Sequence, residues 1–364
     1  MMIIRHIIKL SIQVLTWFLY ILKKVLIPVY KGQYRKILIL YISGMGDIIC
    51  LVPFYNEIRK KYPEAEFQAC FPSDIVELEN SFFEFDGYII HKSYIGTYKE
   101  INSHHFDLII LPGWVLKDSI LALASNAKSI IGYINDLTFS NRYLNKFTLE
   151  GVGIKVKPLQ QDMRSSHLSE RPNLILKHFQ LPQIRRKDIQ LCRNKKPQDY
   201  AVIHAGARFE GRRWNTDGFS DVIRFLISQK YVSKIYLIGS NEDRKINQQI
   251  IQKADLENIS DVSGEMSLLQ TKQLIENACL FIGNDSGPMH IAAISGIPTI
   301  GLLGPNLPDI SGPMGLNSIT IFHQLSCSGC NQRNCISSYR CINLITKEEI
   351  INTCKEIIER EKKN

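Results

Sequence analysis

The sequence predicts an α/β protein made of two doubly wound units in tandem. Short apolar stretches, typical of buried parallel strands, alternate with longer stretches typical of helices along both halves of the chain. The length of 364 residues exceeds one ordinary domain and fits two. A hydrophobic content of 45% is that of a globular protein with a substantial core.

Residues 1–34 form an apolar and basic extension ahead of the first unit. Between Lys9 and Lys23 the chain has 13 residues without a charge, which is fewer than the roughly 20 that span a bilayer. No small-residue cleavage site follows this run, so a signal peptide is not expected. Aromatic residues with basic flanks favour a helix that lies in a membrane interface. A helix packed on the protein's own surface is the alternative.

The first unit, residues 35–180, is expected to begin with a buried strand at Arg35–Ser43. A glycine-containing turn follows, and then a helix over Ile48–Tyr62 with Pro53 near its start. Residues 134–170 are polar and irregular and are expected to form a mobile loop near the substrate. The other predicted strands are Ala65–Phe71, Gly87–His91, Phe106–Leu111 and Ser129–Gly132, with helices near Ile75–Asn80 and Arg171–Phe179.

The second unit, residues 181–364, is expected to repeat this alternation and to end in a charged C-terminal helix. Two such units in tandem are expected to face a central cleft, which is a preferred position for a ligand. The predicted strands are Tyr200–Ala205, Lys234–Gly239, Cys279–Gly283 and Thr299–Leu303, and the predicted helices are Asp217–Lys230, Glu242–Ala254, Ser267–Ala278 and Thr346–Lys362.

The most informative segment is Phe281–Pro305, which predicts a strand, a polar turn, a short helix and a second strand. A helix that begins at the carboxyl end of a parallel strand presents N–H groups and a positive dipole end to an anion. Gly287 lets the backbone approach a ligand closely. Asp285 and Ser286 are residue types that cap helices, and His290 lies about one turn further on. The alternative is that Asp285 and Ser286 only cap the helix and that His290 is solvated.

A second candidate site is the turn Gly44-Met45-Gly46-Asp47 after the first strand. Gly44 and Gly46 allow a ligand to approach the backbone. A carboxylate at this strand-to-helix junction is placed to act as a general base on a bound hydroxyl. The alternative is that Asp47 is an ordinary N-cap.

A third candidate site begins at His204, where another predicted strand ends in small residues. Arg212 and Arg213 follow shortly afterwards, and a guanidinium offers a bidentate fork to phosphate oxygens. Trp214 is expected to pack on a ring or to hold the loop. A solvated basic loop is the alternative for the arginine pair.

These three segments together resemble the glycosyltransferase family 9 heptosyltransferases of bacterial lipopolysaccharide core synthesis. The resemblance runs from about Ile37 to the end of the chain, and it is carried by residues 44–63, 204–215 and, most firmly, 283–305. It implies a GT-B fold, in which two Rossmann-like domains face a central cleft. The acceptor is expected on the N-terminal domain and the sugar nucleotide on the C-terminal domain.

The resemblance also implies a reaction, namely metal-independent transfer of a heptose from ADP-heptose to a lipopolysaccharide inner-core acceptor with inversion at the anomeric carbon. Asp47 matches the position of the proposed catalytic base. Three residues depart from the usual pattern, because Ser286 replaces Thr, Arg212 replaces Lys and Asn215 replaces Pro. The residues expected to bind the donor are His204, Arg212, Asp285, Ser286, Gly287, Met289 and His290.

The formal net charge of +9 indicates anionic partners. Phosphorylated substrates fit this charge, as does the inner face of the bacterial inner membrane, where a cytoplasmic enzyme of this kind is expected to be peripheral. No nucleic acid is expected, because no aromatic-interleaved basic stripe or known nucleic-acid motif is present. The alternative within enzymes is another GT-B protein with a different nucleotide sugar, either a non-heptose transferase or a sugar-nucleotide epimerase.

The tail 327–341 carries Cys327, Cys330, Cys335 and Cys341 with the spacing C-x2-C-x4-C-x5-C. Compact four-cysteine spacing can hold a structural zinc ion. A cytoplasmic location argues against disulfides. Reduced thiols or a redox pair are the alternative, and no cofactor is expected to be required for catalysis.

Overall fold

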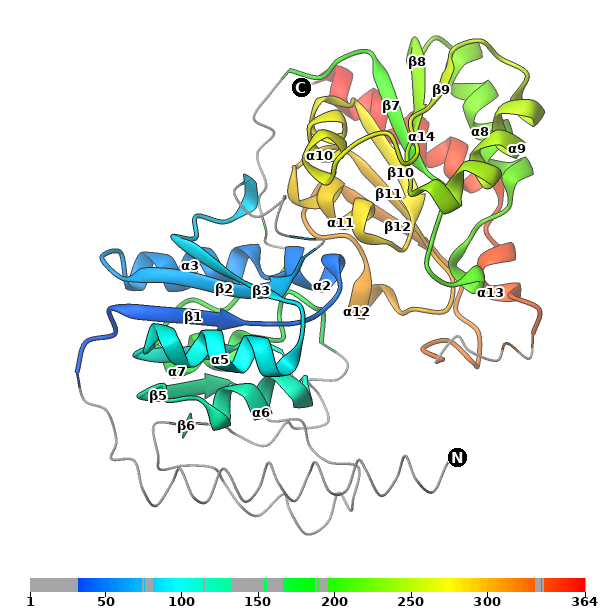
Figure 1. Ribbon diagram of the computed structural model, residues 1–364. Coiled ribbons are helices and arrows are strands. Elements are labelled where there is room, and N and C mark those ends of the chain that lie inside the picture. The colour runs from blue at the N-terminus through cyan, green and yellow to red at the C-terminus, as the bar shows by residue number, and fades with distance from the viewer. Residues whose placement is uncertain are drawn as a thin grey trace. The chain divides into compact units, whose positions relative to one another are not determined.

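The chain divides into two compact units, Met1–Ile184 and Arg185–Asn364 (Figure 1). The computed structural model describes residues 32–73, 75, 81–113, 115–132, 154–155, 166–186, 189, 196–330, 335 and 337–363. The unit boundary lies shortly beyond the position expected from the sequence. Most of the N-terminal extension, most of the 134–170 loop and most of the helix predicted at Ile75–Asn80 lie outside the described residues.

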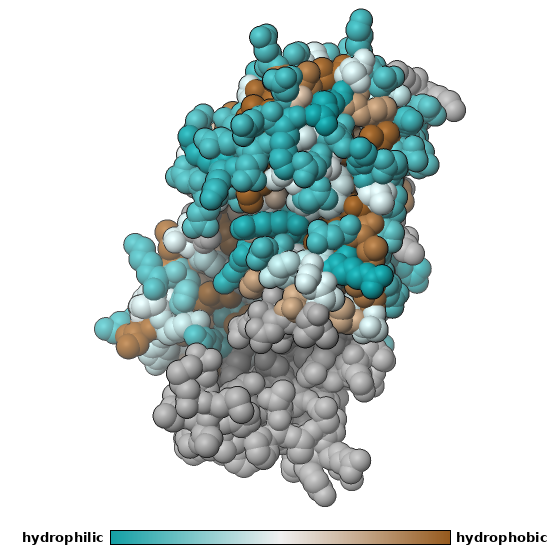
Figure 2. All heavy atoms as spheres, turned by 90° about the vertical axis from the view of Figure 1, so that its right-hand side faces the viewer, coloured by the Kyte–Doolittle hydropathy of each residue, from teal (hydrophilic) through white to brown (hydrophobic). Residues whose placement is uncertain are grey.

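Within the described ranges, no helix is both long enough and apolar enough to cross a bilayer. On the face seen in Figure 2, hydrophilic side chains cover most of the described surface, and apolar side chains form only scattered patches. Such scattered apolar residues are normal for a protein surface.

The first unit contains a sheet of parallel strands in the order β3-β2-β1-β4-β5-β6. This order confirms the doubly wound prediction, and the direction of winding reverses between β1 and β4. Ligands of such sheets bind at the carboxyl ends of the strands beside this switch point. The strands are β1 (Lys36–Leu40), β2 (Glu66–Pro72), β3 (Gly87–His91), β4 (Leu108–Leu111), β5 (Ser129–Gly132) and β6 (Ile154–Lys155).

The single helix predicted at Ile48–Tyr62 is wrong, because the structure has two helices there, α2 and α3, separated by a turn at Cys50 and Leu51. Pro53 lacks an N–H donor and fits only the first turn of a helix, so a new helix starts beside it. The helices of this unit with assigned bounds are α2 (Met45–Ile49), α3 (Val52–Lys61), α5 (Tyr94–His104), α6 (Leu116–Ala124) and α7 (Asn173–His178).

The second unit repeats the same architecture, with parallel strands in the order β12-β11-β10-β7-β8-β9. Its switch point lies between β7 and β10. The sequence reasoning missed β9 and β12, which are edge strands with incompletely buried side chains. The strands are β7 (Tyr200–His204), β8 (Lys234–Leu237), β9 (Ile259–Asp261), β10 (Leu280–Asn284), β11 (Thr299–Leu303) and β12 (Ser318–Phe322).

Helices cover both faces of this second sheet, with α8, α9 and α14 on one side and α10 and α11 on the other (Figure 1). The C-terminal helix α14 buries Ile350, Cys354 and Ile357 in the core of its own unit. The helical elements are η4 (Glu210–Arg212), α8 (Thr216–Ser228), η5 (Asn241–Asp243), α9 (Arg244–Ala254), α10 (Leu268–Asn277), α11 (Gly287–Ile294), α12 (Pro308–Ser311), α13 (Arg340–Asn343) and α14 (Lys347–Lys363).

Candidate functional site

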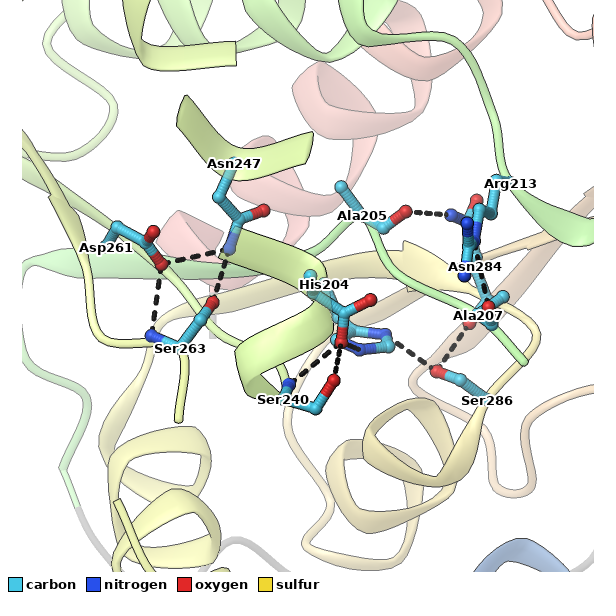
Figure 3. Close-up of polar contacts among 11 residues, drawn as sticks. His204, Ala205, Ala207, Arg213, Ser240, Asn247, Asp261, Ser263, Asn284 and Ser286 are labelled. Carbon is cyan, nitrogen blue, oxygen red and sulfur yellow. Dashed lines mark hydrogen bonds and ion pairs between the residues drawn. The ribbon is translucent and has the colours of Figure 1, made fainter. Parts of the chain in front are cut away.

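A buried asparagine, Asn284, joins the carboxyl ends of the two switch-point strands in the second unit (Figure 3). Its side chain is 0% exposed. Nδ2 donates to the backbone oxygen of Ala205 at 2.7 Å, and Oδ1 accepts from the backbone N–H of Trp214 at 3.1 Å. Because both ends of the buried amide are paired, it fixes the loop after β7 against the end of β10.

Trp214 holds this loop from its other side. Its indole Nε1 donates to the backbone oxygen of Ile345 at 2.9 Å, and its ring packs edge-on against Phe219 with centroids 4.9 Å apart. A Cβ added to Gly218 would lie 2.3 Å from the indole, so the helix that follows can approach only because this residue is glycine. Trp214 is therefore a core residue that anchors the arginine loop.

Arg212 and Asp285 form an ion pair beside the start of α11. Arg212 Nη1 lies 3.5 Å from Asp285 Oδ2, and Asn306 Nδ2 donates to the same oxygen at 2.6 Å. Asp285 is only 3% exposed, and its burial raises its pKa, an effect that the Arg212 charge opposes. The structure therefore brings two of the predicted donor residues together, with the half-buried guanidinium held by a buried carboxylate.

Ser286 is the N-cap residue of α11, but its side chain makes no capping hydrogen bond, so the capping expectation is wrong for this hydroxyl. Its Oγ lies 2.9 Å from His204 Nδ1 and 2.9 Å from the backbone oxygen of Asn284. The N-terminal N–H groups of α11 thus have no side-chain cap from Ser286. An uncapped helix start with a positive dipole end is suited to bind an anion.

The remaining predicted donor residues differ in what they can offer a ligand. Gly287 is half-buried at the start of α11. Met289 is a core residue whose Sδ would lie 2.7 Å from a Cβ added to Gly301, so only its backbone faces the turn. The solvated reading of His290 is wrong, because this side chain is 3% exposed.

In the first unit, Asp47 lies in the first turn of α2, whose N-cap is Gly44, so the reading of Asp47 as an N-cap is wrong. Asp47 is half-buried and accepts a hydrogen bond from Ser43 Oγ at 2.5 Å. Burial raises the pKa of the neighbouring Tyr41 hydroxyl, and the Asp47 charge adds to this rise. A Cβ at Gly44 would meet nothing within 4 Å, so the turn borders open space.

Asp118 is a buried acidic residue near the Asp47 turn that was not predicted from the sequence. It lies in the first turn of α6, after β4, and is only 1% exposed. Its Oδ2 accepts from the backbone N–H of Ile42 at 2.9 Å, whereas its Oδ1 has no hydrogen-bond partner among the described residues. Burial raises the pKa of Asp118 to about 7, and the Ile42 hydrogen bond opposes this rise. An acidic residue soon after a predicted fourth strand was the available signal.

The four cysteines of the tail are all free thiols. Burial raises the pKa of Cys341, and the charges of Cys335, Cys330 and Cys327 raise it further, so the four sulfurs influence one another. Across the described residues, no group of three or more His, Cys, Asp or Glu side chains is arranged to hold a metal ion. The structural zinc site stays a prediction.

Comparison with known proteins points to one family. A model described as glycosyltransferase family 9 (heptosyltransferase) matches residues 97–339, about two thirds of the chain. Lipooligosaccharide heptosyltransferase 2 of Campylobacter jejuni is 24% identical over 219 residues, which cover 56% of this chain and 66% of that protein. The match thus spans just under two thirds of that curated relative's length.

Two solved structures share the fold. A family 9 glycosyl transferase from Veillonella parvula has a TM-score of 0.74 at 19% identity, covering 91% of this chain and 99% of that one. The E. coli heptosyltransferase WaaC, solved with ADP-2-deoxy-2-fluoro heptose, has a TM-score of 0.63 at 16% identity and covers 90% and 99%. These likenesses confirm the predicted GT-B fold class, with a parallel α/β sheet in each unit.

The buried carboxyl of Asp118 predicts a specific dependence of stability on pH. Its folded-state pKa of about 7 lies above the ordinary value of 3.8, so the unfolded chain loses this proton first as pH rises. Stability therefore declines between about pH 4 and pH 7, by at most about 4 kcal/mol. Asp118→Asn keeps an oxygen for the Ile42 N–H but cannot ionise.

We therefore expect thermal melting of the Asp118→Asn chain to gain stability relative to wild type as pH rises from 5 to 7.5. Asp86→Asn is the matched control, since Asp86 accepts from the Phe67 N–H but is exposed, and its curve should run parallel to wild type. Parallel curves for Asp118→Asn as well would contradict the raised pKa.

Proposed function

The chain belongs to glycosyltransferase family 9 (heptosyltransferase), and on this premise we propose that it moves a heptose from ADP-heptose to a hydroxyl of a lipopolysaccharide inner-core or related surface-glycan acceptor. Its relatives include a lipooligosaccharide heptosyltransferase, and a protein of the same fold has been solved with an ADP-heptose analogue. The observation that carries the proposal is the uncapped N-terminus of α11 beside Arg212, at the switch point of the second sheet.

The second unit is assigned to the donor. A diphosphate is doubly suited to this position, because backbone N–H groups and a guanidinium both bind phosphate oxygens. The Asp285 carboxylate orients the Arg212 guanidinium. The carboxylate is buried and accepts a hydrogen bond from Asn306, so it does not present a free negative charge to the phosphate. Ser286, Gly287, Met289 and the rest of the first turn supply the cradle.

The first unit is assigned to the acceptor, with Asp47 as general base. In this mechanism Asp47 takes the proton of the acceptor hydroxyl while the oxygen attacks the anomeric carbon. The new C–O bond forms on the face opposite the diphosphate, the bond from the anomeric carbon to the phosphate oxygen breaks, and ADP leaves. A single displacement of this kind inverts the anomeric centre.

Negative charge grows on the leaving diphosphate as the bond breaks. Arg212 and the start of α11 are fixed in advance, so they stabilise this charge more in the transition state than in the bound donor. No metal ion is needed in this scheme, because these groups supply the positive charge. The net charge of +9 supports work at the anionic inner face of the inner membrane in the cytoplasm.

The alternative is a GT-B enzyme with a different nucleotide sugar, either a transferase of another sugar or an epimerase. Donor screening separates the proposed heptosyltransferase from these alternatives. A heptosyltransferase consumes ADP-heptose, and only when an acceptor is present. An epimerase would convert its nucleotide sugar without any acceptor.

Asp47→Asn should abolish transfer and leave donor binding intact. The amide keeps the shape of the side chain but cannot take a proton, so we expect kcat to fall by about 10²–10⁴-fold. ADP affinity, measured by calorimetry, should be unchanged. Glu57→Gln is the control, since Glu57 forms an ion pair with the exposed Lys60 on α3. Wild-type turnover by Asp47→Asn would remove Asp47 from the role of base.

Arg212→Ala should weaken ADP binding by about 10-fold or more, because it removes a charged hydrogen-bond donor to the diphosphate. Arg212→Lys keeps the charge without the planar fork. Its affinity for ADP should lie between those of wild type and Arg212→Ala. Arg224→Ala, on the surface of α8, is the control. Equal ADP titrations for Arg212→Ala and wild type would show that this guanidinium does not meet the donor.

Transfer should survive treatment with EDTA, measured as heptose incorporated per minute before and after dialysis. Loss of activity that magnesium restores would overturn metal-independent transfer.

Elemental analysis of the protein purified without chelator addresses the four cysteines separately: about one zinc per chain supports a structural site, and its absence supports reduced thiols.

A further inference from the structure

We propose that His204 is a positioning residue for the donor site: its Nδ1–H donates a hydrogen bond to the Ser286 hydroxyl oxygen and so prevents Ser286 from capping α11. The N–H groups of the first helical turn are thereby left for the donor diphosphate. This inference rests on the proposed function, because it concerns the same anion site.

Ser286 is in the position from which a serine ordinarily caps a helix. The preferred partners of an N-cap hydroxyl are the N–H groups two and three residues further on. The first of these positions is Pro288, which has no N–H, and the second is Met289. Ser286 nevertheless directs its Oγ to His204 Nδ1 and to the backbone oxygen of Asn284, both at 2.9 Å. Ser286 therefore makes these two contacts instead of a capping hydrogen bond.

The hydroxyl has one proton and can donate to only one of these two acceptors. If His204 carries its proton on Nε2, then Nδ1 is an acceptor and Ser286 donates to it. If His204 carries its proton on Nδ1, then Ser286 accepts from the ring and donates to Asn284. The tautomer of His204 therefore decides how the hydroxyl is oriented.

The imidazole of His204 is neutral, since burial lowers its pKa to about 4, against the opposing charge of Asp243 and with the charge of Arg213. Nε2 lies 4.0 Å from Asp243 Oδ2. At this distance no hydrogen bond joins the ring to the carboxylate. With the proton on Nδ1, the ring donates to Ser286 Oγ and the hydroxyl donates to the Asn284 oxygen, so both 2.9 Å contacts are hydrogen bonds. These contacts thus select the Nδ1–H tautomer, in which Ser286 Oγ accepts from the ring rather than from the Met289 N–H.

The position of the Asp243 carboxylate is itself tightly fixed. Oδ2 accepts from the backbone N–H and the hydroxyl of Ser240, at 2.8 and 2.9 Å. A Cβ on Gly206 would lie 2.3 Å from Asp243 Oδ1, and a Cβ on Gly239 would lie 2.7 Å from Asp243 Cβ. Both glycines let backbone pack directly on the carboxylate. A continuous chain of contacts therefore links η5, the end of β7 and the start of α11.

The chain of contacts has a consequence for donor binding. Without His204, the Ser286 hydroxyl is free to rotate toward the Met289 N–H and to compete with the diphosphate for it. We therefore expect His204→Phe to weaken ADP binding by about 10-fold, the size of one hydrogen bond to a charged group. His204→Asn, whose side-chain amide N–H can replace Nδ1–H as a donor, should bind ADP more tightly than His204→Phe does.

A double-mutant cycle between His204→Phe and Ser286→Ala tests the proposal, with ADP affinity measured by calorimetry on the full chain. Because alanine cannot cap the helix, His204→Phe should cause no further loss in the Ser286→Ala background. Losses that simply add would contradict the proposal. His323→Phe, at a half-buried histidine that pairs with Glu349, is the control and should bind ADP as wild type does.

A spectroscopic measurement keeps the test independent of how well the variants fold. The ring ¹⁵N shifts of His204 in the wild-type chain, assigned by comparison with His204→Asn, report the tautomer directly. We expect a neutral ring with the proton on Nδ1 from pH 5.5 to 8, and a mixture of tautomers in Ser286→Ala. A proton on Nε2 in wild type would overturn the proposal. Failure of the wild type to bind ADP at all would instead overturn the proposed function.

Discussion

In each unit a buried polar side chain, at the last residue of the fourth strand or shortly after it, bonds the backbone just beyond the end of the first strand. In the second unit Asn284 donates to the Ala205 carbonyl, and in the first unit Asp118 accepts from the Ile42 N–H. The strands diverge at this switch point, so the ladder of sheet hydrogen bonds cannot continue there. A buried backbone group left unpaired would cost about 1–3 kcal/mol. These two side chains therefore pair backbone groups at the carboxyl ends of the sheets, beside the candidate site residues.

The chemistry of the second unit follows from this closure. Asn284 fixes the end of β10, and the next two residues have different partners. Asp285 pairs with Arg212, and Ser286 bonds His204. Positive potential at the start of α11 and at Arg212 is thereby presented without a capping side chain in the way. In the proposed function these charges and dipoles meet a diphosphate, and they are oriented by buried partners rather than by the ligand.

The sequence predicted both doubly wound units, most strand positions and the turns that carry Asp47 and Ser286, because apolar periodicity and glycine placement are local signals. It did not predict Asp118, whose role depends on a strand order that brings residue 118 beside residue 42. It also assigned Ser286 to capping, because the competing hydrogen-bond partner, His204, is distant in sequence and adjacent only across β7 and β10. Local patterns therefore located the candidate site, and tertiary contacts decided which partners its side chains have.

We propose that the turns at Asp47 and Ser286 serve heptose transfer from an ADP-linked donor. The most direct measurement incubates the full chain with ADP-heptose and a panel of truncated lipopolysaccharide acceptors and follows each acceptor by mass spectrometry. We expect the gain of a single heptose residue on at least one acceptor, with release of one ADP for each heptose transferred. Unaltered acceptors throughout the panel, together with turnover of a different nucleotide sugar by the same preparation, would contradict it.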